Sequence, residues 1–226
     1  MTVKATKSPT RVYLEVGERR VFAGALDWPG WSRSGKSEQL ALEALRAYTP
    51  RYEPVAREAG VAFPAGAGDA FEVVERLPGS MTTDFGAPGA VPAADSKPLS
   101  APEAKRLGAL VAGAWAFLDR VAAGAPAELR KGPRGGGRDR DKLIEHVLAA
   151  EVAYARKLGV KPGQPAVGDA PAIAVLRQGI LAALSGPSDG APPVAKGWPP
   201  RYAARRIAWH VLDHAWEMED RGTPGG

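Results

Sequence analysis

The sequence predicts an α+β protein in which a small strand-strand-helix-strand unit precedes an antiparallel four-helix bundle. Two patterns of apolar residues lead to this prediction. Near the N-terminus they alternate with polar residues, as in half-buried strands, whereas after residue 100 they recur at helical spacing over long stretches. A proline-rich stretch with neither period, residues 78–100, separates the two patterns and is interpreted as a linker.

The first two strands are expected to form a hairpin. Val12, Leu14 and Val16 alternate with polar neighbours, and a second strand begins at Val21 after a turn at Gly17.

One helix and one further strand complete the N-terminal unit. Ser37 can cap the helix, and Pro50 predicts that it ends at Thr49 because the residue before a proline disfavours helical geometry. Residues 70–77, AFEVVERL, supply the last strand. We therefore place the first domain at residues 1–77.

Four helices are expected in the second domain, residues 101–226. Ser100 and Glu103 have the spacing of a capping box at the start of the first helix, which extends to about residue 123. The other helices are predicted at 138–158, 170–184 and 200–220. Helices of this length are typical of a bundle.

Composition excludes several classes of function. With 45% hydrophobic and 24% charged residues the chain is typical of a soluble protein. The absence of cysteine removes thiolate metal sites and cysteine nucleophiles, so a metal would have to bind His, Asp or Glu. The N-terminus lacks the apolar stretch of a signal peptide, and no apolar run suggests a membrane partner. We expect a bacterial, cytoplasmic protein.

All three histidines fall on predicted helices of the second domain. His210 and His214 are four residues apart, which places them about 40° apart on one helix face. His146 lies on another helix, beside the small residues Ala149, Ala150 and Ala153, which leave room for ligands that converge from a facing helix. Neutral imidazoles bind divalent transition metals. The pattern favours a metal site, although surface or core histidines are an alternative.

Two segments resemble a known family. RDKLIEHVLAAEVAYARKLG is similar to the second helix of the DinB-like metal-binding bundles, and RRIAWHVLDHAWEMED is similar to their last helix, with its H-x3-H. The superfamily includes mycothiol- and bacillithiol-dependent S-transferases and a mycothiol-dependent maleylpyruvate isomerase. The resemblance implies one divalent ion on His146, His210 and His214, with open positions for water and substrate. Zinc is the first expectation, with nickel, manganese or iron as alternatives, together with a low-molecular-weight thiol.

Charged residues near the histidines are candidates for further roles. Asp213 and Glu217 could orient an imidazole or act as a catalytic base, and Arg206 could bind an anionic substrate. The basic loop RKGPRGGGRDRDK offers a similar role to Arg134, Arg138 and Arg140, with Arg138 the preferred substrate-binding residue; a solvated linker is the alternative. No aromatic residue accompanies this loop, which argues against a nucleic-acid partner.

The first domain contains GWSRSGKS, a formal match to the phosphate-binding loop of nucleotide hydrolases. Fewer than about 80 residues precede the linker, too few for the parallel sheet that such enzymes need, so we reject nucleotide hydrolysis. The segment ALDWPGWSRSGKSEQLALEALRAY resembles instead the HicB-like fold, a small domain that often partners a toxin. Trp28 and Trp31 are expected in its core, with a position over the pocket of the helical bundle as the alternative.

Two functions from different classes remain open. The first is a metal-dependent enzyme, S-transferase-like, in which the ion activates a thiol or water against a small electrophilic substrate; isomerase and hydrolase chemistry belong to the same hypothesis. The alternative is a non-catalytic, metal-stabilised binding or regulatory protein that recruits a protein or nucleic-acid partner. A homodimer is compatible with either.

Overall fold

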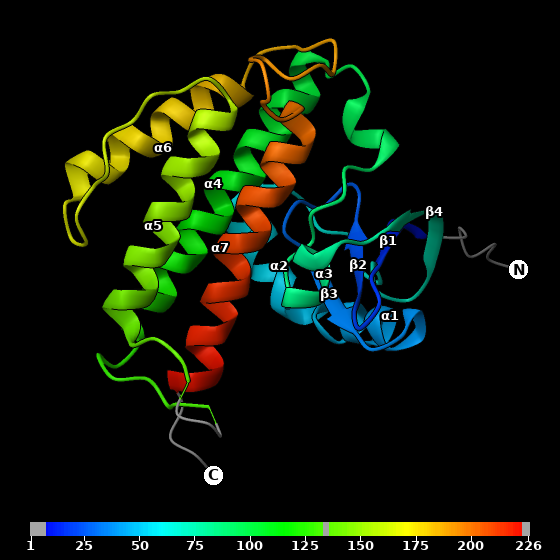
Figure 1. Cartoon of the computed structure of the whole chain (residues 1–226), viewed down its shortest axis with the longest axis horizontal. Coiled ribbons are helices and arrows are strands. Elements are labelled where there is room, and N and C mark those ends of the chain that lie inside the picture. The colour runs from blue at the N-terminus through cyan, green and yellow to red at the C-terminus, as the bar shows by residue number, and fades with distance from the viewer. Residues whose placement is uncertain (1–7, 133–135, 223–226) are drawn as a thin grey trace, which may run out of the picture.

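A computed structural model describes residues 8–132 and 136–222 and shows a mixed α+β protein with a four-stranded sheet and seven α-helices in that part of the chain (Figure 1). The strands are β1 Thr10–Val16, β2 Val21–Ala25, β3 Ser32–Gly35 and β4 Phe71–Pro78. The helices are α1 Glu38–Ala47, α2 Thr49–Glu58, α3 Met81–Phe85, α4 Ala101–Gly124, α5 Arg140–Lys157, α6 Ala170–Leu184 and α7 Pro200–Gly222.

The sheet has the strand order β3-β2-β1-β4, with β1 parallel to β4 and the other pairs antiparallel. The predicted hairpin is present as β1 and β2. Strand β3 was not predicted, because its sequence, SRSG, has none of the apolar alternation that indicates a half-buried strand. It pairs with β2 at the edge of the sheet, where backbone hydrogen bonds rather than apolar side chains define it.

Strand β3 also decides how GWSRSGKS is to be understood. Four of its residues, Ser32–Gly35, form an extended strand, and Ser37 caps α1 by accepting a hydrogen bond from the amide of Leu40. A phosphate-binding loop needs these residues to curl around an anion instead. These residues are therefore not arranged as a phosphate-binding loop.

The helical part of the N-terminal half is longer than predicted. The chain does not leave helical structure at Pro50 but begins a second helix, α2, in which Pro50 occupies the first turn. A proline is tolerated there because a first-turn amide has no intrahelical partner. Trp31 is fully buried and stacks on Tyr52 of α2, and Trp28 is also buried, so the core placement of both tryptophans is confirmed.

Residues 78–100 contain more order than the linker interpretation implies. Met81–Phe85 form the short helix α3, capped by Ser80, and residues 93–96 form a 3-10 turn. Asp95 is fully buried and pairs with Arg205 of α7 at 2.6 Å. The prolines break periodicity but do not prevent packing, which the sequence pattern could not show. Core residues from the sheet and from the later helices belong to one continuous cluster.

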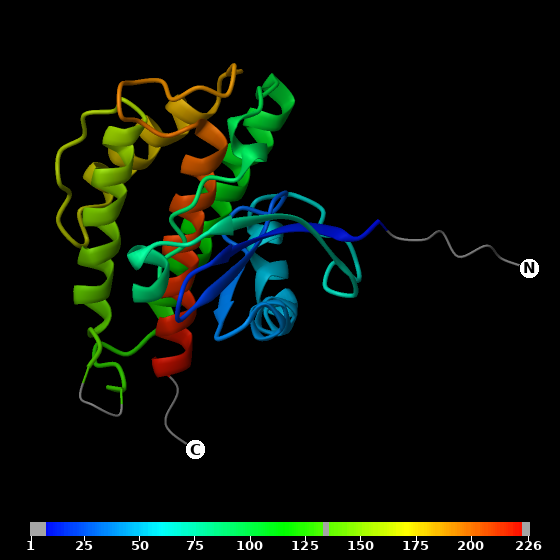
Figure 2. The same ribbon diagram turned by 45° about the vertical axis from the view of Figure 1, so that its right-hand side comes forward.

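Helices α4 to α7 have nearly the predicted boundaries, and the capping box of Ser100 and Glu103 is present. Helix α7 packs against both α4 and α5, and α6 packs against α4 and α5. Figures 1 and 2 show α7 between α5 and the sheet, with α5 running opposite to α7 and α4 running in the same direction as α7. The α+β class is thus confirmed.

By length and composition, α4 is the one described helix that could cross a membrane. More than half of its most apolar window, 56%, is buried inside the protein, as is usual for a core helix.

Helix α5 carries a carboxyl group, that of Glu151, which is buried against α4 and α6. Glu151 is 1% exposed, and its carboxylate is 3.5 Å from Arg177. Burial raises the pKa of Glu151 to about 7, although Arg177 opposes the shift. The folded protein therefore holds this proton more tightly than the unfolded chain does.

This shift predicts a pH dependence of stability. The contribution of Glu151 is fully present below its unfolded pKa of 4.5 and is lost as the pH rises to about 7. The loss amounts to ~3 kcal/mol, since one pKa unit is about 1.4 kcal/mol. Urea unfolding at pH 5 to 8 should show that Glu151→Gln is stabilised relative to the wild type as the pH rises. The control is Glu145→Gln, which changes an exposed carboxylate on the same helix. If the free energy of unfolding of Glu151→Gln and of the wild type changed equally with pH, the assignment would be contradicted.

Candidate metal centre

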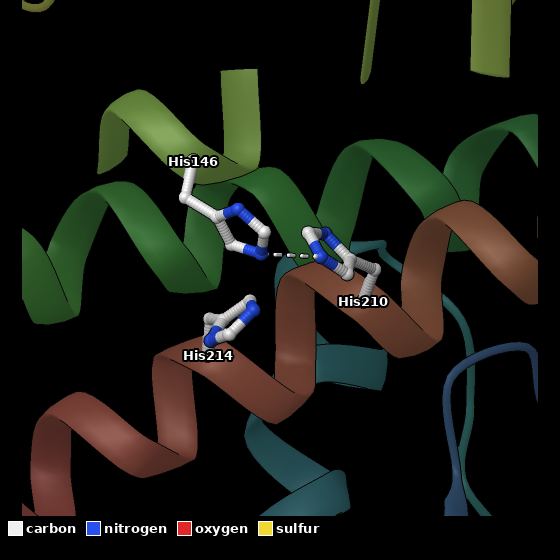
Figure 3. Close-up of side chains that lie close together, drawn as sticks. All are labelled: His146, His210 and His214. Atoms are coloured by element: carbon white, nitrogen blue, oxygen red, sulfur yellow. Dashed lines mark hydrogen bonds between the residues drawn. The ribbon is translucent and has the colours of Figure 1, made fainter. Parts of the chain in front are cut away.

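Two neighbouring helices bring the three histidines together. His210 and His214 lie one turn apart on α7, and His146 lies on α5, which packs against that part of α7. Figure 3 shows the three imidazoles converging in the space between the two helices. The spacing of the pair on α7 was visible in the sequence, whereas the approach of His146 required the helix packing.

The distances fit the coordination of a single ion. Nε2 of His146 and Nε2 of His210 are 3.3 Å apart, and one ring nitrogen from each of the three histidines lies within 4.8 Å of the others. Two nitrogen ligands at the Zn–N bond length on a tetrahedral ion are roughly 3.3 Å apart. Three such ligands leave at least one position of the ion open. The donor set is therefore suited to a divalent metal.

Burial favours the neutral, metal-binding form of two of the imidazoles, those of His210 and His146. Burial lowers the pKa of His210 to about 2, and the neighbouring charges of His214 and His146 add to this effect. Burial also lowers the pKa of His146. A ligand that stays unprotonated at neutral pH needs to release no proton before it coordinates.

Glu217 fixes the orientation of one ligand. Nδ1 of His214 is 2.8 Å from the carboxylate of Glu217, and the other carboxylate oxygen is 3.0 Å from Arg221. With Nδ1–H donating to Glu217, Nε2 is left free for the ion, the arrangement common among metal-binding histidines. The hydrogen bond from His214 lowers the pKa of Glu217, so the carboxylate stays charged.

Asp213, the other predicted catalytic carboxylate, has a different partner. It forms an ion pair of 2.9 Å with Arg33 of β3, in the contact between α7 and the sheet. The structure therefore brings Glu217, and not Asp213, into hydrogen-bond contact with a candidate ligand. Asp213 and Glu217 are four residues apart and so lie only about 40° apart around the helix, which explains why sequence spacing could not separate the two.

The predicted substrate-binding residues also differ in their placement. Arg138 is exposed and lines a shallow hollow together with His146 and Ala149. Its charge contributes to the lowered pKa of His146. Arg134, from the same basic loop, lies outside the described residues. Arg140 instead donates hydrogen bonds to Asp141 and to the backbone carbonyl of Ala125, so its guanidinium stabilises the loop.

Arg206 lies one turn before His210 on α7. Its guanidinium carbon is 4.5 Å from the centre of the Trp209 ring and 5.7 Å from that of Tyr154. The Tyr154 ring in turn lies 5.7 Å from the His210 ring. Sequence reasoning did not identify either aromatic residue, because Tyr154 reaches His210 only through the packing of α5 on α7.

Comparisons with known proteins add no relatives. The chain matches no family model, and no curated protein or solved structure is significantly similar to it.

Proposed function

We propose that this protein is a metal-dependent enzyme of the S-transferase type, in which His146, His210 and His214 hold one divalent ion. The observation that carries the proposal is the convergence of three imidazoles whose ring nitrogens lie within 4.8 Å of one another. A divalent ion in this position would act as a Lewis acid that lowers the pKa of a thiol or water. The resemblance of the two helical segments to DinB-like bundles supports the same chemistry, as does the packing of α4 to α7, for which a four-helix bundle remains our interpretation.

The residues of the chain have separate tasks in this proposal. His146, His210 and His214 are ligands, and Glu217 holds His214 with its Nε2 toward the ion. Zinc suits three nitrogen ligands best, with nickel, manganese or iron as alternatives. The absence of cysteine fits an enzyme whose thiol arrives as a low-molecular-weight co-substrate.

The role of Glu217 predicts a difference between two conservative changes. Glu217→Gln keeps an acceptor for His214 but removes the charge, so we expect metal affinity to fall about tenfold, at the lower end of the 10–100-fold effect of outer ligands. Asp213→Asn should leave the affinity within about twofold, because Asp213 bonds to Arg33. Competition titration with a zinc chelator measures both. Equal losses in the two variants would contradict the assignment.

Cobalt substitution tests the catalytic part of the proposal. If the site is open, 2-mercaptoethanol should produce a thiolate charge-transfer band in the cobalt protein, whereas ethylene glycol, the matched diol, should not. His210→Ala should abolish the band. Spectra that are unchanged by any thiol would remove the S-transferase proposal and favour the alternative, a structural metal in a binding or regulatory protein.

A further inference from the structure

Three nitrogen donors within about one turn of α7 are buried and have no hydrogen-bond partner among the described residues. They are Nη1 of Arg206, Nε1 of Trp209 and Nδ1 of His210. Buried polar groups in folded proteins are nearly always paired, and leaving a charged one unpaired costs free energy. Their clustering beside the metal centre indicates that an acceptor from outside the chain completes the site.

Arg206 differs from the other arginines of α7 in having no carboxylate partner among the described residues. Arg201, Arg205 and Arg221 each form an ion pair with a carboxylate. Arg206 forms no ion pair with any residue that the structure describes, and its guanidinium lies instead against the Trp209 ring. A partly exposed arginine with one buried, unpaired nitrogen is well suited to donate two parallel hydrogen bonds to a carboxylate.

Aromatic rings connect Arg206 with the metal centre. Tyr154 lies within 5.7 Å of both the guanidinium of Arg206 and the ring of His210, measured to ring centres. Trp198 packs against Tyr154, with the centres of the two rings 5.1 Å apart. Rings of this kind bind flat apolar groups by offset or edge contacts. The surroundings of Arg206 therefore favour a ligand that is both anionic and flat.

We infer that Arg206 is a substrate-binding residue that takes the carboxylate of a small aromatic or conjugated acid. The flat part of this acid lies against Tyr154, which directs the rest of the molecule toward the three histidines. The catalytic part of this inference rests on the proposed function, because it requires a metal ion at the three histidines to act on the reacting group of the acid. The binding of the carboxylate itself depends on α7 and the aromatic rings alone.

Calorimetric titration with benzoate tests the inference, with benzamide as a neutral probe of the same shape. Benzoate should bind at least tenfold more tightly than benzamide. Arg206→Met, which still covers the Trp209 ring, should weaken benzoate binding at least tenfold, and Arg206→Lys should recover part of the loss because it keeps the charge without the planar fork. Arg156→Met, an exposed arginine on α5, is the matched control and should bind as the wild type does.

The same titration after treatment with a chelator separates this inference from the metal proposal. Benzoate should still bind through Arg206 in the chelated protein, so a failure to find any metal would leave the subsite standing. Equal binding of benzoate and benzamide by the wild type, no binding of benzoate, or undiminished binding by Arg206→Met would overturn the inference. The first two outcomes need no variant, so they decide the question even if Arg206→Met does not fold.

Discussion

Replacing His210 by alanine should reduce the metal content of the purified protein from close to one divalent ion per chain to close to none. His210 is the most buried of the three candidate ligands, and its Nε2 lies 3.3 Å from that of His146. Removing it leaves two ligands, and the loss of affinity should exceed the 10–100-fold effect of losing an outer partner. Elemental analysis of protein incubated with zinc, nickel or manganese and then desalted measures the result.

The control for this experiment is Glu145→Ala, which removes an exposed carboxylate next to His146 in sequence. It should retain the ion, because the candidate centre consists of the three imidazoles. Wild-type protein that stays free of metal under all three conditions would refute the metal centre. Full metal content in His210→Ala would place the ion elsewhere.

Asp95→Asn should lower the free energy of unfolding by 3–5 kcal/mol, the typical cost of leaving one charge of a buried ion pair without its partner. Asp95 is fully buried, and its two oxygens lie 2.6 and 3.0 Å from nitrogens of Arg205. Arg205 also donates to the backbone carbonyls of Ala25 and Leu26, so it is held in place and cannot turn to solvent. Such a loss is a large part of the 5–15 kcal/mol that stabilises most proteins.

Urea unfolding of Asp95→Asn and Glu58→Gln gives the comparison. Glu58 pairs with Arg120 at the surface, so the same change from carboxylate to amide should cost no more than about 1 kcal/mol there. If the two variants lose similar stability, then the Asp95–Arg205 pair does not join the segment 78–100 to α7 in the way that the structure indicates.

The sequence predicted those features that depend on residues close together in the chain. The capping box at Ser100 located the start of α4, and the four-residue spacing of His210 and His214 placed both on one face of α7. The helical spacing of apolar residues also predicted both ends of α6, Ala170 and Leu184.

The features that sequence reasoning missed depend on contacts between distant segments or on weak local signals. Strand β3 is polar and short, and only its pairing with β2 defines it. Asp213 and Glu217 are four residues apart on one helix, and only the position of β3 shows that Asp213 bonds to Arg33. The burial of Asp95 follows from Arg205, 110 residues later, which no local pattern could indicate.

The position of α7 between the sheet and α5 has a consequence for dissecting this protein. One side of the helix carries the candidate metal ligands, and its other side is covered by the sheet: Gly30 lies so close to Ala208 and Leu212 that a Cβ on this glycine would be within 3.1 Å of them. A fragment that begins at residue 101 would expose this apolar side to water, and exposed apolar surface of that kind promotes aggregation. A substitution at the Gly30 turn, far from the histidines in sequence, would shift the helix that carries two of them. Directed-evolution libraries aimed at the metal centre should therefore include the turn between β2 and β3.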